Sequence, residues 1–292
     1  MIRFERVAVI GVGLIGGSFA LALKKARLCG HVVGIGRSAA NLQVAKDRGI
    51  IDSIAAHAGD ADLVLVATPV AQFPQVLASL APRLKPSAIV MDAGSTKRDV
   101  VAAARSALGA KIPQFVPAHP VAGSDESGVA AASAGLYRGR EVILTPLPEN
   151  RPASIERVRA AWQACGARVT EMSPSDHDAV LAAVSHLPHL LSFALMRDIA
   201  QRADSGSFLA HAGSGFRDFT RLAASNPEMW RDICVANRAA LLGELRSYQD
   251  ELARLGAMLE QGDAEGLQRA LEEARAARRA WSAQRGAPDV AR

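Results

Sequence analysis

A glycine-rich run near the start of the chain has the spacing that suits a bound phosphate group. The run Gly11-Val12-Gly13-Leu14-Ile15-Gly16 follows the apolar segment Val7–Ile10 and precedes a stretch with helical periodicity. In this context the first glycine permits a tight turn, the second lets the backbone approach a pyrophosphate, and the third lets helix and strand pack closely. Free N–H groups at the helix start favour the anion. The run therefore predicts a dinucleotide site.

The end of the second predicted strand indicates which dinucleotide is preferred. An NAD site usually carries an acidic residue there, which binds the ribose hydroxyls. Here Val33-Gly34-Ile35 leads into Gly36-Arg37-Ser38, with no acid. Arg37 can pair with a 2′-phosphate and Ser38 can donate to it, a contact of about 1.5–3 kcal/mol. We predict NADP, with NAD possible as second cofactor. The residues expected to touch it are Gly11, Gly13, Leu14, Ile15, Gly16, Arg37, Ser38, Thr68 and Pro69.

Histidines in two short motifs could take part in proton transfer. His119 follows the predicted strand Gln114–Val116, which would place it at the carboxyl edge of a sheet. Imidazole titrates near neutrality and suits a general base. His186 and His189 are three residues apart, a spacing also found in metal sites. The chain has no HExxH motif or clustered carboxylates, so we expect a pocket wall and no metal.

The elements that must position these residues change character halfway along the chain. In the first half, apolar runs alternate with helix-like segments, which predicts a Rossmann-type, doubly wound parallel sheet. The strands are expected at Val7–Ile10, Val32–Ile35, Leu63–Val66, Ile89–Met91, Gln114–Val116, Val142–Leu144 and Arg168–Thr170, and the helices at Gly17–Ala26, Ala39–Arg48, Ala71–Ala81 and Ala153–Cys165.

The second half, after residue 173, is predicted to be almost purely helical as far as about Trp281. We expect a sheet domain at 1–173, a helical domain at 174–282 and a flexible tail at 283–292. Within Asn237–Glu260, leucine or tyrosine recurs in alternating steps of four and three residues. This heptad-like seam can pack inside the chain or against a second subunit.

Composition excludes several classes of protein. Net charge is +5, but basic and acidic residues are interspersed, and aromatics are only 4%, which argues against nucleic-acid binding. The three cysteines show no pairing pattern, which is typical of a reducing compartment. No signal peptide and no apolar stretch of transmembrane length are apparent. We expect a cytoplasmic protein that contacts neither nucleic acid nor membrane.

Four further segments carry a family resemblance. They are DAGSTK at 92–97, HPVAGSDESG at 119–128, SHLPH at 185–189, and GFRDFTR at 215–221 followed by NPEMW at 226–230. Together with the glycine-rich start, they resemble the prephenate/arogenate (cyclohexadienyl) dehydrogenase family in order and spacing. The resemblance implies a Rossmann domain joined to an all-helical dimerisation domain, and hence a homodimer. It implies oxidative decarboxylation of prephenate or arogenate in tyrosine biosynthesis, with hydride transfer to the nicotinamide.

The resemblance also implies roles for individual residues. His119 would be the catalytic base, oriented by Ser95, and Arg221 would hold a substrate carboxylate. Trp230 would reach the active site of the partner subunit, and a further set would line the pocket: Ser185, His186, His189 and Ser124. Many members carry Asp where this chain has Gly36, so NAD use is not inherited.

Two charged residues near these motifs have more than one expected role. Arg217 lies four residues before Arg221 and can assist it or lie at the rim. Asp125 can pair with the ammonium of arogenate or with Arg217 as a gate. Two rival functions are a β-hydroxyacid dehydrogenase or imine reductase, and a non-enzymatic NAD(P)-sensing module. The hydroxyacid dehydrogenases use a lysine in their helical half. This chain has no lysine after Lys111, which argues against that function.

Overall fold

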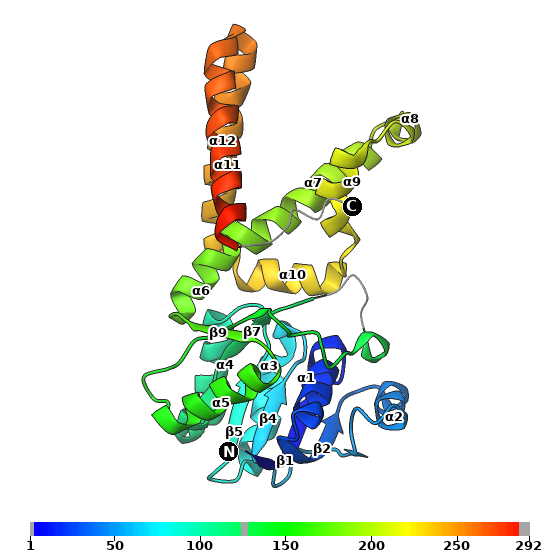
Figure 1. Ribbon diagram of the computed structural model, residues 1–292, viewed down its shortest axis with the longest axis vertical. Helices are drawn as coiled ribbons and strands as arrows, with labels where there is room; N and C mark the ends of the chain where they lie inside the picture. Colours follow the sequence, from blue (N-terminus) through cyan, green and yellow to red (C-terminus); the bar gives the residue numbers. More distant parts are fainter. Residues whose placement is uncertain (1–2, 124–127, 286–292) are drawn as a thin grey trace. The chain divides into compact units, whose positions relative to one another are not determined.

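The computed structural model describes residues 3–123 and 128–285 (Figure 1). Its first half contains a parallel six-stranded sheet in the order β3-β2-β1-β4-β5-β6. The predicted doubly wound fold is therefore confirmed. The two-residue β3 escaped prediction because it is too short to show a pattern. The strands are β1 Phe4–Ile10, β2 Cys29–Ile35, β3 Ser53–Ile54, β4 Leu63–Val66, β5 Ile89–Asp92 and β6 Phe115–Val116.

Helices cover both faces of this sheet and bury a separate core on each. Successive residues of a strand point to opposite faces, so Val7 and Val9 lie in one core and Ala8 and Ile10 in the other. The first core is closed by α1, α2 and α5, and the second by α3 and α4. These helices are α1 Leu14–Lys25, α2 Ala39–Asp47, α3 Phe73–Leu80, α4 Arg98–Leu108 and α5 Pro152–Ala164, with 3₁₀ turns at Val70–Gln72, Ala81–Arg83, Gly109–Gln114 and Val129–Ala131.

A second, three-stranded sheet, which the sequence analysis did not separate from the main sheet, contains His119. It consists of β7 (Ala118–Val121), β8 (Glu141–Leu144) and β9 (Arg168–Glu171), with β7 antiparallel to β8. The predicted strands near 142 and 168 belong here. His119 follows β6 of the main sheet, as expected, but it also lies within β7 of this second sheet. Pro120 hid β7 from the sequence pattern, yet it is tolerated because β7 is an edge strand.

The helical half begins with one continuous helix that changes its winding. It runs through α6 (Pro174–Leu181), a π-helical turn (Ala182–His186) and α7 (Leu187–Ala200). Pro188 has no N–H to donate to the preceding turn, and its ring crowds that turn, so the wider π turn accommodates it. The rest of this half is also helical, as predicted: α8 Ser205–Ala210, α9 Ser214–Thr220, a 3₁₀ turn Arg221–Ala224 and α10 Pro227–Ala236.

The continuous helix Pro174–Ala200 contradicts the expectation that no stretch has transmembrane length. It spans 27 residues with a mean hydropathy of 1.6 in its most apolar window, and 28% of that window is buried in this chain. By length and composition alone it could cross a membrane. The same helix carries the buried polar residues His177, Asp178 and His186, which bond to other parts of the chain.

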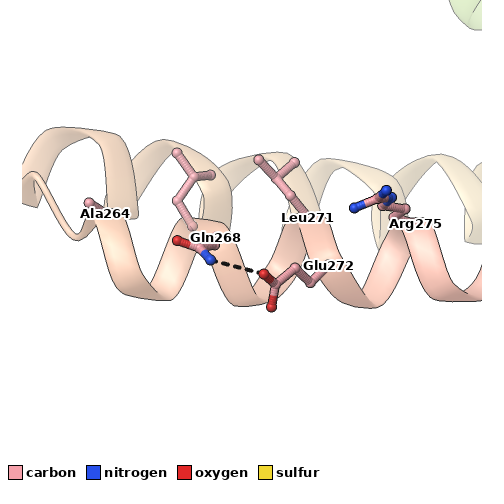
Figure 2. A pocket seen from close by; sticks show the side chains of 6 residues that line it. Ala264, Gln268, Leu271, Glu272 and Arg275 are labelled. Atoms are coloured by element: carbon pink, nitrogen blue, oxygen red, sulfur yellow. Dashed lines mark hydrogen bonds between the residues drawn. The ribbon is translucent and has the colours of Figure 1, made fainter.

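The chain divides into two compact units, 1–241 and 242–292. Most of α11 (Arg238–Gln261) and all of α12 (Ala264–Arg285) belong to the second. The predicted seam helix is confirmed, and its Leu252 and Leu259 are at least half exposed. A shallow groove follows α12 around Leu271 (Figure 2). α12 continues to Arg285, three residues into the tail expected from residue 283.

Candidate active site

The glycine-rich run forms the turn between β1 and α1. Gly11 has φ +94°, and a Cβ there would lie 2.5 Å from the carbonyl oxygen of Ala67, so this turn requires glycine. A Cβ on Gly16 would lie 2.2 Å from the Gly11 oxygen, because helix and strand pack closely. A Cβ on Gly13 would meet no atom of the described residues within 4 Å. That open space is where a pyrophosphate would approach the backbone.

A cleft of about 830 Å³ opens beside this turn and fits a dinucleotide. The start of α1 has no side-chain cap and no acidic residue in its first turn, so its N–H groups remain available to an anion. The buried hydroxyl of Thr68 has no hydrogen-bond partner among the described residues. Of the predicted cofactor residues, those that line the cleft are Gly11, Gly13, Arg37, Ser38, Thr68 and Pro69, whereas Leu14, Ile15 and Gly16 form the first turn of α1 behind it.

The end of the cleft near β2 carries positive charge. Arg37 lies exposed on its wall, and Arg83, which the sequence analysis did not single out, lines the same cleft. Ser38 caps α2 by accepting a bond from the Asn41 N–H at 3.2 Å, which leaves its hydroxyl hydrogen able to donate. A Cβ on Gly36 would make ordinary contact with Leu42 at 3.5 Å, so a side chain fits there.

Two alanine substitutions should separate the roles of the glycines. Gly13→Ala adds its methyl group to open space, so we expect unchanged stability but a cofactor Kd raised about tenfold or more, since each 1.4 kcal/mol lost is a factor of ten. Gly16→Ala places a methyl group against backbone and should destabilise the fold by about 1–3 kcal/mol. Calorimetric titration with cofactor and chemical denaturation measure the two effects. Equal effects of both substitutions on stability would contradict this assignment.

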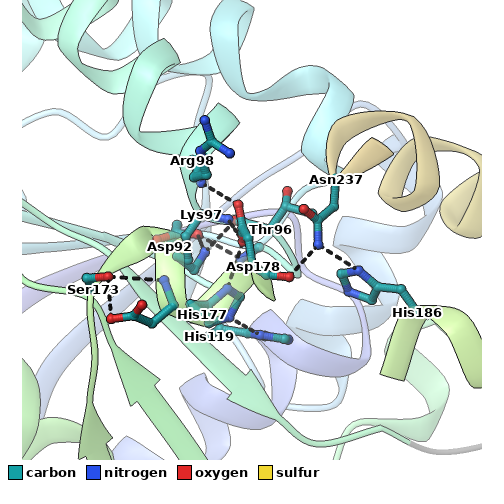
Figure 3. A network of polar contacts seen from close by, with 12 residues as sticks. Asp92, Thr96, Lys97, Arg98, His119, Ser173, His177, Asp178, His186 and Asn237 are labelled. Carbon is teal, nitrogen blue, oxygen red and sulfur yellow. Dashed lines mark hydrogen bonds and ion pairs between the residues drawn. The ribbon is translucent and has the colours of Figure 1, made fainter. Parts of the chain in front are cut away.

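The ring of His119 is held by a second histidine. His119 is 8% exposed, and its Nδ1 lies 2.8 Å from Nε2 of His177 at the start of the helical half (Figure 3). Burial lowers the pKa of His119 well below its ordinary 6.5, and electrostatic interactions with His177, Lys97 and His186 lower that pKa further. The imidazole is therefore uncharged at neutral pH, as a general base must be.

Asp178 connects this pair of histidines to the start of α4. Its Oδ1 accepts bonds from Nδ1 of His177 at 2.8 Å and from the Lys97 N–H at 2.8 Å. Its Oδ2 accepts from the Arg98 N–H at 2.9 Å, so Asp178 caps α4 from another helix. Burial alone would raise the pKa of Asp178, but the bonds from His177 and from the two backbone groups outweigh it and hold that pKa low.

A fully buried ion pair lies beside these residues. Nζ of Lys97 is 2.6 Å from Oδ2 of Asp92, and both side chains have no exposed surface. The Asp92 carboxylate also accepts from the N–H groups of Gly94 and Ala118, so it ties the end of β5 to the start of β7. Although burial raises the pKa of Asp92, these donors satisfy it as a carboxylate. The pair fixes the strand that carries His119.

Ser95 was expected to orient His119, and this role stays a prediction. It is half-buried in the loop after β5, and no hydrogen bond joins it to the imidazole among the described residues. His177 supplies that contact instead. A contact from Ser95 to substrate or cofactor stays a prediction.

The SHLPH segment forms a wall in which each histidine has a partner. Nδ1 of His189 bonds to the Ser185 carbonyl oxygen at 2.9 Å, and its ring stacks on Trp230 with centroids 3.6 Å apart. His186 is buried, bonds to Asn237 at 3.1 Å, and has its pKa lowered to about 4 by burial. Because Trp230 stacks on His189 of the same chain, its expected reach into a partner's site stays a prediction.

Of the other predicted substrate residues, Arg221 lies near this wall. Arg221 and Arg217 are exposed, and the charge of Arg221 contributes to the lowered pKa of His189, which places the two near each other. Burial is the larger cause of that shift. Ser124 and Asp125 lie outside the described residues. No group of three or more possible metal ligands occurs within 3–123 and 128–285.

The sequence analysis missed the residues that support His119. His177 and Asp178 lie four and five residues after the expected domain boundary at residue 173, in the segment predicted only to be helical. Lys97 was noted only as part of a motif, and Asn237 only as the first residue of the seam. An adjacent His-Asp pair at the start of a predicted helix was the available signal.

Comparisons with known proteins agree with this architecture. Residues 19–171 match the model of the prephenate dehydrogenase nucleotide-binding domain, and residues 173–273 match that of the prephenate dehydrogenase dimerization domain. Prephenate dehydrogenase of Bacillus subtilis is 35% identical over 277 residues, which are 93% of this chain and 74% of that protein.

Solved structures of prephenate and arogenate dehydrogenases are also similar to this chain over most of its length. The crystal structure of Aquifex aeolicus prephenate dehydrogenase with hydroxyphenyl propionate and NAD⁺ has a TM-score of 0.88 and 33% identity, covering 94% of this chain and 97% of that one. Synechocystis arogenate dehydrogenase has a TM-score of 0.81 and 28% identity, covering 95% and 100%. Two matched domains and a relative of this identity show that the chain belongs to the prephenate dehydrogenase family, a family of NAD(P)-dependent dehydrogenases.

Proposed function

We propose that this protein oxidatively decarboxylates prephenate to 4-hydroxyphenylpyruvate, arogenate to tyrosine, or both, in tyrosine biosynthesis, with NADP as the preferred cofactor. The observation that carries the proposal is His119, an uncharged buried imidazole held next to the end of β5, two strands from the dinucleotide turn in the main sheet. The relatives named above act on the same two substrates according to their names.

The chemistry needs a base and an electron sink. Both substrates are cyclohexadienes with a ring hydroxyl opposite a carbon that bears a carboxylate. His119 accepts the hydroxyl proton, which typically contributes about 10²–10⁴ in rate. When bound, the nicotinamide accepts the hydride that leaves the carbinol carbon. The ketone that forms is conjugated through the diene, so it takes up the electron pair released as carbon dioxide departs, and the ring becomes aromatic.

A cationic group must hold the substrate carboxylates near this base. Arg221 is our candidate because a planar guanidinium binds a carboxylate in a bidentate manner. It lies near His189, whose wall includes Ser185, His186 and Trp230. Arg217, four residues earlier, can assist it. The two roles of Asp125, pairing with the arogenate ammonium or gating with Arg217, both remain open.

The preference for NADP depends on Arg37 and on the missing acid at Gly36. Arg37→Leu should lower the ratio of kcat/KM with NADP to that with NAD by about 10–150-fold, the equivalent of 1.5–3 kcal/mol. Gly36→Asp should lower the ratio further, because a carboxylate there repels the 2′-phosphate and accepts bonds from the ribose hydroxyls. Space for that side chain exists, since its Cβ meets Leu42 only at ordinary contact distance.

Steady-state kinetics with both cofactors measure this preference. Arg105→Leu is the matched control, since Arg105 pairs with the partly exposed Glu149 and does not line the cleft. It should leave the cofactor ratio unchanged. A wild-type enzyme that uses NAD as efficiently as NADP would refute the preference.

We also propose that the protein forms a homodimer through its helical segments and is located in the cytoplasm. The model that matches residues 173–273 is that of a dimerization domain. In this single chain, apolar side chains of the helical half remain exposed, among them Val184 at 70% and Leu259 at 66%. A second copy would remove such surfaces from water. Sedimentation equilibrium measures the oligomeric state. A protein that is monomeric at micromolar concentration would contradict the proposed homodimer.

The experiment that tests the function is a comparison of kcat/KM for prephenate and arogenate, each with NADP and with NAD. We expect turnover with at least one substrate, faster with NADP. Absence of turnover in all four combinations would refute the proposal and favour a non-enzymatic NAD(P)-binding module.

A further inference from the structure

A buried chain of hydrogen bonds leads from His119 through His177 to Asp178 (Figure 3). We propose that His177 and Asp178 are positioning residues which fix the tautomer of His119, with the proton on Nδ1 and a lone pair on Nε2. Nε2 is then the atom that accepts the substrate proton. The inference rests on the proposed function for the role of His119 as base, but the tautomer itself can be observed without substrate.

The argument starts at Asp178, whose protonation state the backbone determines. Both of its oxygens accept backbone N–H groups, from Lys97 at 2.8 Å and from Arg98 at 2.9 Å. A backbone N–H can only donate, so neither oxygen needs a proton. The carboxylate also lies at the amino end of α4, where the helix dipole favours negative charge. Asp178 is therefore an acceptor toward His177.

The tautomers of the two histidines follow from that acceptor. Nδ1 of His177 lies 2.8 Å from Oδ1 of Asp178, so it must carry the proton. Burial lowers the pKa of His177, which keeps its ring neutral and leaves Nε2 as an acceptor. Nδ1 of His119, at 2.8 Å, must then donate to it. A neutral His119 has one N–H, so its Nε2 carries the lone pair.

Among the described residues, the other groups near His119 do not supply this control. Lys97 and His186 interact electrostatically with His119, but Lys97 donates to Asp92 and Thr96, and His186 bonds to Asn237. When His119 takes up the proton, its Nδ1–H remains directed at His177, and the carboxylate of Asp178 stabilises the positive charge along the chain. This arrangement has the logic of an acid–histidine pair that orients a base.

Substitutions at His177 distinguish positioning from a merely structural role. His177→Leu removes the acceptor, so His119 should lose its fixed Nδ1–H tautomer and kcat should fall about 10–100-fold, as for outer groups that orient a functional histidine. KM should change less than about threefold, since substrate contacts remain. His177→Gln can place its amide oxygen near the former Nε2 position, and it should recover most of kcat and of the tautomer.

A further variant and a control complete the set. His177→Asn reaches Asp178 but is too short for His119, so it should resemble His177→Leu and replaces that variant if leucine prevents folding. His31→Gln, at the amino end of β2 where the ring bonds to Ser53, should change neither kcat nor the His119 tautomer.

The tautomer is read from two-bond ¹H–¹⁵N correlations of ¹⁵N-labelled enzyme without substrate, with the His119 signals identified by their loss in His119→Asn. We expect a protonated Nδ1 and a bare Nε2 in the wild type and in His177→Gln. An unchanged His119 tautomer in both His177→Leu and His177→Asn, or a His177→Gln enzyme no faster than these two, would overturn the proposal. A wild type without turnover would refute the function and leave the tautomer result standing.

Discussion

The His119→Asn enzyme is expected to lose about 10²–10⁴ in kcat, the usual contribution of a general base, while KM changes little. Asparagine resembles the Nδ1 side of imidazole, so it can keep the contact that His119 makes with His177. It cannot accept the substrate proton. Steady-state kinetics on the folded variant measure both constants. His31→Asn is the matched control and should keep wild-type kcat.

The pH profile of the wild type gives a second measure of the same base. Burial lowers the pKa of His119, and the facing groups His177, Lys97 and His186 lower it further. The active form is the uncharged one, so a lower pKa keeps His119 active as the medium becomes more acidic. We expect kcat/KM to hold its plateau below pH 6.5 before it declines. An acid limb centred at or above 6.5, or a His119→Asn enzyme with near wild-type kcat, would contradict the assignment.

Lys97→Met should destabilise the protein by about 3–5 kcal/mol, the usual cost of removing one partner from a buried ion pair. The substitution leaves the Asp92 carboxylate without its cation, in a place with no exposed surface. The two backbone donors to Asp92 cannot replace the charge. Because Asp92 joins β5 to β7, activity should fall together with stability. Chemical denaturation monitored by circular dichroism measures the loss.

The matched control replaces a lysine whose ion pair is partly exposed to solvent. Lys85 pairs with Asp62, and these side chains are 31% and 25% exposed. Lys85→Met should cost at most about 1 kcal/mol, because solvent screens the pair. If both substitutions lowered the free energy of unfolding equally, burial of the Lys97–Asp92 pair would not explain its contribution to stability.

Apart from the two-residue β3, the strands of the main sheet were predictable because each contains a continuous apolar run. Val7–Ile10 and Leu63–Val66 are covered on both faces, and a parallel sheet requires continuous apolar residues there. The second sheet was not predictable in the same way. Its β7 contains His119 and Pro120, two residues that a strand pattern does not favour, and it is held in place through Asp92 rather than by its own composition.

The candidate site was predictable where one motif carries the chemistry, and not where distant segments meet. Gly11 and Gly13 lie in a local turn, so their spacing alone indicates the cofactor site. The contact of His119 with His177 joins residues 58 positions apart, and the cap that Asp178 gives to α4 spans about 80. No local pattern records such contacts. The packing of α6 against the start of α4 creates them.

One assay tests the central claim most directly: reduced nicotinamide and released carbon dioxide are quantified together while purified enzyme acts on prephenate, and separately on arogenate, with NADP. We predict that both products form in a one-to-one ratio with at least one substrate, and that His119→Asn abolishes both in parallel. Reduced nicotinamide without carbon dioxide, or neither product with either substrate, would contradict the account.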